Sequence, residues 1–261
     1  MIDLPSPALI GVIHLAPLPG SARQILTMDE VVERAVTDVQ ALKAASFDAA
    51  IVENYGDAPF SAGPLPPASL AAMAVVADRV RRAGALPIGI NALRNDALGA
   101  LGIAAAVGAS FIRVNVHAGV SASDQGLLKG KAHETLAYRK LLGMRIAILA
   151  DVHVKHSTPI SEPDIARAAR DAAYRGLADG LIVTGPATGE EVSEDELRRV
   201  REAVPDRRVF VGSGVRAETV ASLLTLASGV IVGSSIKVDG RPDNPVDAAR
   251  ALALCRAAGR N

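Results

Sequence analysis

The feature that most constrains the fold is an eightfold alternation between short apolar segments and helical patterns. Buried parallel strands read as short apolar runs, and each needs a crossover connection, usually a helix, before the next strand. The predicted strands are residues 8–14, 48–53, 87–91, 111–116, 145–151, 180–184, 209–211 and 230–232. Eight such units predict an α/β fold, a single (β/α)8 (TIM) barrel domain over residues 1–261, with an open doubly wound sheet as the alternative.

The helical patterns between these strands carry recognisable boundaries. A capping box, Thr27 followed by Glu30, opens the first helix, and Ser193 with Glu196 opens a later one. The other predicted helices are residues 68–83, 97–107, 131–142, 163–175 and 245–258, with a further helical interval between the last two strands. Three strand-to-helix links are long, 14–29, 53–68 and 116–131, as expected for binding loops or a lid at one end of a barrel.

Charge and composition bear on which partners the protein binds and on where it is located in the cell. The chain has 28 Lys and Arg against 28 Asp and Glu, so its net charge favours neither nucleic acid nor an anionic membrane as the main partner. No apolar run approaches the roughly 18 residues of a membrane span, and the first residues lack the pattern of a signal peptide. With a single cysteine, Cys255, expected as an inert core residue, we expect a cytoplasmic protein, with homo-oligomerisation left open.

Two small-residue turns follow the last two predicted strands. Residues 209–211 run into Gly212, Ser213 and Gly214, and residues 230–232 run into Gly233, Ser234 and Ser235. Glycines let the backbone approach a ligand closely, and free N–H groups in such turns bind anions. In a barrel the loops after the seventh and eighth strands often form a phosphate site. We therefore predict phosphate binding there, with help from Lys237 and from Gly189 in the turn after the sixth strand.

Polar side chains stand at the ends of the other strands, where an active site of this fold lies. Arg113 is expected to pair with Glu53 or Asp151, because a buried charge is costly without a partner. The predicted catalytic residues are His14, Glu53, Asp151, His153 and Lys155, and the predicted substrate-binding residues are Asn54, Asn91, Arg113, Asn115 and Thr184. His117 and His133 are expected on the surface.

The run from Asp151 to His156 has the highest density of reactive groups. The period of a strand predicts Asp151, His153 and Lys155 on one face, with His14 across the mouth from Asp151 as a partner in acid–base chemistry. Lys155 either contacts an anion or forms a Schiff base. Glu53, Asp151 and His153 could instead ligate a divalent metal, although no cofactor is expected.

Motifs across nearly the whole chain resemble one known family. They are residues 11–20, 52–60, 91–96, 111–115, 151–156, 183–189, 211–214 and 231–240. This combination resembles the BtpA/SgcQ family. The resemblance implies a phosphate-binding (β/α)8 barrel, together with an association with photosystem I biogenesis in cyanobacteria and with sugar-utilisation gene clusters in other bacteria.

Three functions remain open at this point. The first is an enzyme acting on a small phosphorylated sugar or phosphoribosyl compound by isomerisation, aldol-type cleavage or glycosidic hydrolysis. The second is a non-catalytic assembly or stability factor that uses the barrel as a scaffold. The third is a metal-dependent hydrolase on the same barrel. We favour the first, because mixed polar groups and two anion-binding turns converge on one end of the predicted barrel.

Overall fold

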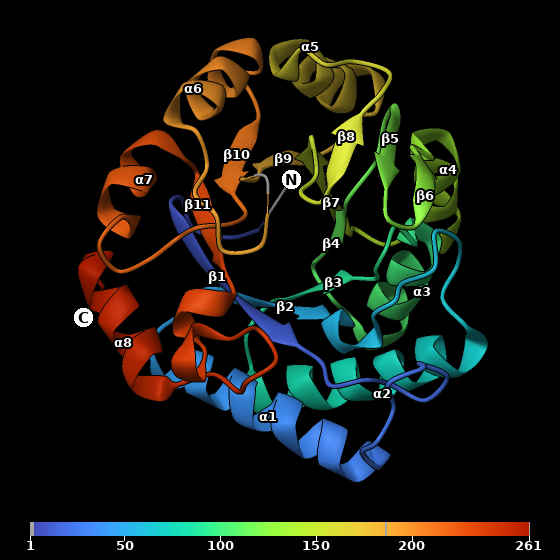
Figure 1. Cartoon of the computed structure of the whole chain (residues 1–261), viewed down its shortest axis with the longest axis vertical. Helices are drawn as coiled ribbons and strands as arrows, with labels where there is room; N and C mark the ends of the chain where they lie inside the picture. The colour runs from blue at the N-terminus through green and yellow to red at the C-terminus, as the bar shows by residue number, and fades with distance from the viewer. Residues whose placement is uncertain (1–2, 186, 261) are drawn as a thin grey trace.

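The computed structural model describes residues 3–185 and 187–260, and Pro186 of the turn after the sixth predicted strand lies outside them. Eight parallel strands close into a barrel in the order β1-β11-β10-β9-β7-β4-β3-β2 (Figure 1). The barrel strands are β1 (Ala8–His14), β2 (Ala49–Glu53), β3 (Ile88–Asn91), β4 (Phe111–Val114), β7 (Ala147–Val152), β9 (Gly180–Val183), β10 (Arg208–Val211) and β11 (Gly229–Val232). The predicted barrel is confirmed.

Eight helices of the described chain surround this barrel (Figure 1). They are α1 (Met28–Ala44), α2 (Pro67–Gly84), α3 (Ala97–Val107), α4 (Ala132–Leu142), α5 (Ile165–Arg170), α6 (Glu194–Ala203), α7 (Val220–Leu226) and α8 (Ala248–Ala257). The capping box of Thr27 and Glu30 forms at the start of α1, and the Ser193 side chain accepts the N–H of Glu196 at the start of α6. The helix predicted over 163–175 is instead divided between α5 and a π-helical turn, Asp171–Arg175.

Alternation along the strands separates two apolar layers. Side chains such as Ile10, Val12, Ile51, Leu149 and Ile231 belong to one cluster inside the barrel. Their neighbours along the same strands belong to a larger cluster that also contains the apolar faces of the helices. Successive side chains point to opposite faces of a strand. This division therefore fixes which residues at the end of each strand face the barrel axis.

A second, small sheet lies beside the barrel strands and was not predicted. It contains β5 (Val120–Ser123), β6 (Gly126–Lys129) and β8 (Ser157–Pro159), in the order β6-β5-β8 with antiparallel pairs. The link between β4 and α4 supplies the hairpin, and the link after β7 supplies the third strand (Figure 1). Pairing across these two long links holds them together over one side of the barrel.

Two expectations about the rest of the chain can be compared with the structure. Cys255 is buried, and burial raises the pKa of its thiol to about 11, which keeps it protonated and unreactive near neutral pH. Within residues 3–185 and 187–260, no helix is both long and apolar enough to cross a bilayer.

Candidate active site

Side chains one layer above the apolar filling of the barrel form the floor of the site. His14 follows the inward Val12 by two positions, and Glu53 follows the inward Ile51 in the same way. The same spacing places Arg113 above Phe111 and Asp151 above Leu149. The strand period that builds the core therefore also brings these polar side chains toward one axis.

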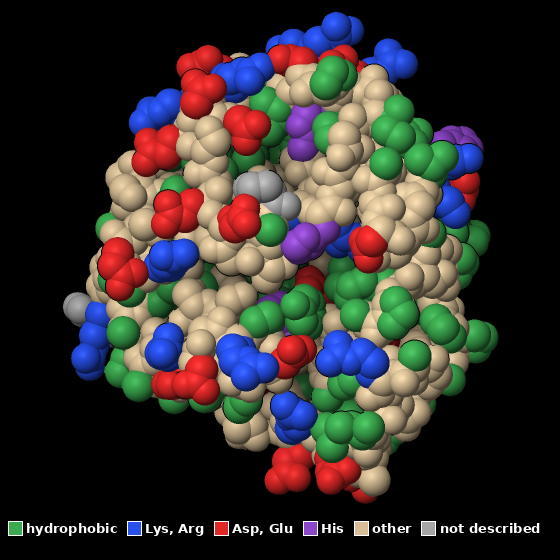
Figure 2. Space-filling view, viewed as in Figure 1, with side chains coloured by type: hydrophobic (Ala, Val, Ile, Leu, Met, Phe, Trp, Pro, Cys, Tyr) green, Lys and Arg blue, Asp and Glu red, His purple; other side chains and the backbone are tan. Residues whose placement is uncertain are grey.

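Two cavities open at this end of the barrel. The first, of about 470 Å³, is lined by the turns after β10 and β11, namely 212–214 and 233–235, by Gly189, and by His14, Glu53, Arg113 and Lys155. The second, of about 370 Å³, shares Glu53, Arg113 and Lys155 with the first and adds Arg23, Tyr55, Asn91, Arg94 and Asn115. In the space-filling view, acidic, basic and histidine side chains surround the hollow at the middle of this face (Figure 2).

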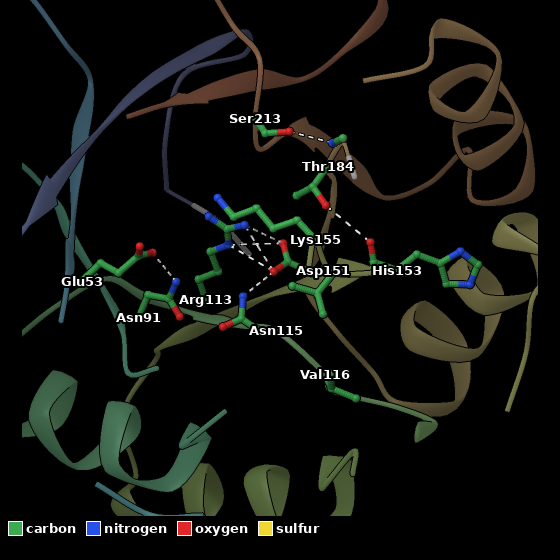
Figure 3. Close-up of polar contacts among 12 residues, drawn as sticks. Glu53, Asn91, Arg113, Asn115, Val116, Asp151, His153, Lys155, Thr184 and Ser213 are labelled. Atoms are coloured by element: carbon green, nitrogen blue, oxygen red, sulfur yellow. Dashed lines mark hydrogen bonds and ion pairs between the residues drawn. The ribbon is translucent and has the colours of Figure 1, made fainter. Parts of the chain in front are cut away.

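Arg113 is held by a buried carboxylate. Its Nη2 lies 3.0 Å from Asp151 Oδ1, and its Nε donates to both oxygens of Asp151 at 3.2 and 3.3 Å (Figure 3). The Asp151 side chain is fully buried and also accepts a bond from Asn115 Nδ2 at 2.5 Å. The expected pairing of Arg113 is thus confirmed with Asp151. The carboxylate lies behind the guanidinium and does not line either cavity.

Glu53 occupies the boundary between the two cavities. Its Oε2 accepts a bond from Asn91 Nδ2 at 2.5 Å, and its Oε1 lies 3.7 Å from His14 Nε2. Burial alone raises the pKa of Glu53, but the nearby His14, Arg113 and Lys155 and the bond from Asn91 outweigh it and lower the net pKa. Glu53 is therefore a carboxylate at neutral pH and an acceptor of protons.

His14 lies opposite Asp151 across the barrel, since β1 and β7 are four strands apart in the closed order of eight. Its Nδ1 is 3.0 Å from the Pro242 carbonyl oxygen, and because a carbonyl only accepts, Nδ1 carries the proton. Burial lowers the pKa of His14 to about 4, against the opposing effect of Glu53. At neutral pH its Nε2 is thus an unprotonated acceptor that faces Glu53.

The lowered pKa of His14 predicts a specific pH dependence of stability. Unfolding returns the pKa from about 4 to about 6.5, so the unfolded chain binds the extra proton first as the pH falls. Stability is complete above pH 6.5 and falls by about 3 kcal/mol between pH 6.5 and pH 4, at about 1.4 kcal/mol per unit. Urea unfolding of wild type and His14→Gln at pH 7 and pH 4.5 measures this loss.

The exposed His133 on α4 provides the control for that experiment. The variant His14→Gln should lose less stability than wild type on acidification, whereas His133→Gln should follow wild type. Equal acid sensitivity in all three proteins would contradict a buried, neutral His14.

Two amide oxygens at the mouth lack a donor within the described chain. Asn91 Oδ1 and Asn115 Oδ1 are both buried without a hydrogen-bond partner, and both residues line the second cavity. The orientation of each amide is fixed, because the carboxylates of Glu53 and Asp151 only accept and therefore face the Nδ2 groups. Each amide is therefore held by a carboxylate, with its oxygen enclosed next to the second cavity.

Ser234 and the backbone of its turn offer free donors to the first cavity. Ser235 Oγ donates to Val215 O at 2.6 Å, and Ser213 Oγ donates to Glu190 O at 3.1 Å, so both hydroxyl protons are already used. Ser234 Oγ has no such bond to the described residues. Ser234 also opens a short 3₁₀ turn, Ser234–Ile236, whose first N–H groups lack partners within the turn.

Close packing explains two of the glycines in these turns. A Cβ on Gly233 would lie 3.0 Å from Cε1 of the His14 ring, so the turn after β11 lies directly against that ring. Gly214 has φ +68°, and a Cβ there would lie 2.4 Å from the Glu190 carbonyl oxygen. Any side chain at Gly214 would therefore disturb the fold as well as the cavity, which makes Ser234 the better position for a test.

The structure does not bring every predicted site residue to the mouth. Strand β7 ends at Val152, and His153 adopts φ +54°, so its side chain turns away from Asp151 and Lys155 and its Nε2 meets Glu162 O at 2.8 Å (Figure 3). The expectation of a common face for Asp151, His153 and Lys155 was wrong, because it assumed that the strand continued. The alternative of a metal site from Glu53, Asp151 and His153 is likewise not assembled, because His153 turns away from the other two. No group of three or more His, Cys, Asp and Glu able to hold a metal occurs in residues 3–185 and 187–260.

Lys237 is placed away from the cavity by a buried ion pair. Its side chain is fully buried, and Nζ lies 2.7 Å from Asp38 Oδ2 of α1. The predicted contact of Lys237 with phosphate therefore needs correction. Asp38, which interrupts the apolar face of α1, is the sequence signal that could have identified this pair.

Asn54 and Thr184 are buried and line neither cavity. Asn54 braces the links after β2 and β3: its Nδ2 donates to Asp57, and its Oδ1 accepts the N–H of Leu93. Thr184 Oγ1 lies 3.4 Å from the His153 carbonyl oxygen. Both residues hold the loops around the site in place through hydrogen bonds. Their positions outside the two cavities do not support the predicted contact with substrate.

Other residues of the site escaped prediction. Arg94 is buried, lines the second cavity and donates to Lys155 O at 2.6 Å. Tyr55 stacks on His14 with ring centroids 4.6 Å apart, and Arg216 lines the first cavity. Each follows a predicted strand end within a few residues, which is the signal that could have found them. His117, expected on the surface, is buried and bonds Gly176 O, whereas His133 is exposed as expected.

Comparison with known proteins gives one family match and many structural ones. The family model described as the BtpA family matches residues 6–260. A relative from Synechocystis, named Photosystem I biogenesis protein BtpA, is 46% identical over 249 residues, which cover 95% of this chain and 87% of the relative.

Solved structures with the same barrel are distant in sequence. A phosphoribosyl anthranilate isomerase from Thermus thermophilus has a TM-score of 0.59 and 11% identity, and the match covers 96% of this chain and 98% of that one. An orotidine 5'-phosphate decarboxylase from Pyrococcus horikoshii has a TM-score of 0.58 and 13% identity, with 97% and 100% covered. At these identities the likeness shows the fold alone.

Proposed function

The chain belongs to the BtpA family, and we propose that it is an enzyme that binds a small phosphorylated sugar or phosphoribosyl compound and performs acid–base chemistry on it. One observation carries the proposal. The cavity beneath the two small-residue turns shares Glu53, Arg113 and Lys155 in its lining with a second cavity, which also contains the asparagine side chains Asn91 and Asn115. The two cavities thus offer a place for an anion beside a place for hydroxyl groups.

The first cavity supplies the chemistry that a phosphate needs. The turn 233–235 presents the Ser234 hydroxyl and the first N–H groups of a helical turn, and Arg216 adds positive charge to the lining. Such groups bind a dianion through directed hydrogen bonds at low cost in reorganisation. With the phosphate there, the rest of a small sugar reaches the boundary formed by Glu53 and Lys155.

Proton transfer is assigned to the pair of His14 and Glu53. Neutral His14 offers its Nε2 as a base, and the Glu53 carboxylate lies 3.7 Å from it, so a proton taken from the substrate can be held between them. The Arg113 guanidinium, oriented by Asp151, faces the same space and stabilises negative charge that develops on an oxygen of the substrate. Isomerisation, aldol-type cleavage and glycosidic hydrolysis all use these steps.

The structural neighbours support this proposal in one respect. Their names, phosphoribosyl anthranilate isomerase and orotidine 5'-phosphate decarboxylase, denote enzymes of phosphorylated compounds on the same barrel. We propose further that the chemistry here needs no metal or organic cofactor and takes place in the cytoplasm.

The test is thermal unfolding of the protein with a panel of ligands. The panel contains inorganic phosphate, pentose and hexose phosphates, nucleoside monophosphates and the unphosphorylated form of each. A ligand at 100 times its Kd stabilises the folded state by about 2.7 kcal/mol, a shift that is easily measured. Only the phosphorylated members should stabilise, and Ser234→Glu should remove the effect because it adds a carboxylate to the turn.

A matched control separates this effect from general destabilisation. Ser222 is exposed on α7 and does not line the first cavity, so Ser222→Glu makes the same chemical change elsewhere and should keep the response to phosphorylated ligands. Stabilisation by the unphosphorylated compounds alone would contradict the proposed phosphate site.

A second function, a non-catalytic scaffold for assembly, is favoured by two observations. The Synechocystis relative is named a photosystem I biogenesis protein, and an apolar cavity of about 710 Å³ lies on the outer side between α2 and α3. Apolar surfaces of this kind serve as contact sites for other proteins. If no member of the ligand panel shifts the unfolding transition, this scaffold function becomes the better proposal.

A further inference from the structure

Two lysines near the barrel axis have opposite surroundings. Lys237 is fully buried, with its Nζ 2.7 Å from Asp38 Oδ2. Lys155 lines both cavities, and within the described residues its Nζ makes no hydrogen bond and no ion pair with a carboxylate. One lysine is therefore tied into the structure, and the other presents its amine to the cavities.

The Arg113 guanidinium is a near neighbour of the Lys155 side chain (Figure 3). In the close-up of the site, its side chain extends toward the Arg113 guanidinium, whose carboxylate partner Asp151 lies behind it (Figure 3). Arg94 Nη2 donates to the Lys155 carbonyl oxygen, which brings a second guanidinium to the same segment. Burial lowers the pKa of Lys155, and the neighbouring Arg113 lowers it further, against the opposite effect of Glu53 and Asp151.

A lysine that is partly desolvated beside another cation is the usual form of an activated amine nucleophile. A lysine that only binds anions would gain nothing from losing its charge. The position of Lys155 in the lining of both cavities adds a geometric reason, because a substrate that spans the two cavities lies beside this side chain.

We propose that Lys155 forms an imine with the carbonyl group of a phosphorylated ketose or aldose. This inference rests on the proposed function and narrows it to substrates with a free carbonyl and to reactions at the carbon beside it. It does not extend to glycosidic hydrolysis, which has no free carbonyl.

The step is balanced within the site. The neutral amine nitrogen of Lys155 adds to the carbonyl carbon and gives up a proton, while the carbonyl oxygen takes one, to give a neutral carbinolamine. The hydroxyl then leaves as water after a second protonation, so that amine, carbonyl and one proton become a protonated imine and water. Glu53 and His14, which line the first cavity with Lys155, carry the protons.

The protonated imine then withdraws electrons from the neighbouring carbon. Loss of a proton there, or cleavage of the next carbon–carbon bond with release of an aldehyde, gives an enamine. Protonation of the enamine at carbon and hydrolysis by one water return the free Lys155 amine and the product. An isomerase that inverts the carbon beside the carbonyl, or an aldolase-type lyase, follows from this intermediate.

The experiment traps the imine in the wild-type protein. The protein is incubated at pH 7 with dihydroxyacetone phosphate or ribose 5-phosphate, reduced with sodium borohydride, digested, and mapped by mass spectrometry. Reduction converts an imine to a stable secondary amine that adds the mass of the reduced sugar phosphate. We expect the adduct on Lys155 to exceed that on the exposed Lys131, because the lowered pKa of Lys155 leaves a larger fraction of its amine neutral.

Lys155→Arg is the matched variant, since it keeps the positive charge and removes the nucleophile. Its adduct at position 155 should disappear, while stabilisation by the same sugar phosphates in thermal unfolding should remain. Labelling of Lys155 no greater than that of Lys131, with stabilisation intact, would overturn the imine and leave the phosphate-binding enzyme standing. Absence of both adduct and stabilisation would overturn the proposed function with it.

Discussion

Asp151→Asn is expected to lower the free energy of unfolding by about 3–5 kcal/mol, the cost of leaving a buried guanidinium without its carboxylate. The side chains of Asp151 and Arg113 are 0% and 3% exposed, so water cannot replace the lost charge. The substituted amide also loses a negative acceptor for the bond from Asn115. Urea unfolding at pH 7 measures the change.

The double variant Arg113→Met with Asp151→Leu provides the control for this result. A buried ion pair replaced by apolar side chains of similar volume is often close to neutral in stability. The double variant should thus be more stable than Asp151→Asn, although it removes a cation from both cavities. A loss below about 1 kcal/mol in Asp151→Asn, the range of a surface pair, would show that Arg113 does not depend on this carboxylate.

Asp38→Ala is expected to have an effect of similar size, about 3–5 kcal/mol, at the other side of the barrel. It leaves the fully buried Lys237 ammonium without a partner and also removes the acceptor for the N–H of Val246. This second bond joins α1 to the segment before α8. The measurement is again urea unfolding, with Asp29→Ala, an exposed position in the first turn of α1, as the control.

A double variant of the Asp38–Lys237 ion pair tests whether Lys237 binds phosphate. In the double variant Asp38→Leu with Lys237→Met, phosphorylated ligands should still stabilise the protein, because Lys237 does not line the first cavity. If that response is lost while the fold is retained, Lys237 does contribute to phosphate binding, as predicted from the sequence.

The barrel could be predicted from sequence because its signals are local. Short apolar strands, capping pairs such as Thr27 with Glu30, and small-residue turns after the last two strands each act within a few residues. The small sheet of β5, β6 and β8 was missed for two reasons: β5 and β6 form a hairpin with only four residues in each strand, and the pairing of β8 with β5 joins links that are separated in sequence.

The site residues were predicted correctly within the strands, where side chains alternate between the two faces. The prediction failed for several residues that follow the last residue of a strand. His14, Glu53 and Arg113 continue the inward side of their strands, and period 2 places them at the mouth. His153 lies beyond the last residue of β7, in a left-handed conformation that no pattern of side chains announces. Lys237 was misplaced because its partner, Asp38, lies 199 positions away.

The two cavities are built from different parts of the chain, and this division bears on how a protein of this kind can change its substrate. The first cavity takes its turns from the links after β9, β10 and β11, whereas the second is lined mainly by the links after β1, β2, β3 and β5, with His156, Thr188 and Asp243 added from the links after β7, β9 and β11. Exchange, lengthening or shortening of a link such as 55–66 can thus alter one half of the binding space without rebuilding the other. The barrel gives evolution, or a protein engineer, two separately adjustable parts that meet at a fixed set of reactive side chains.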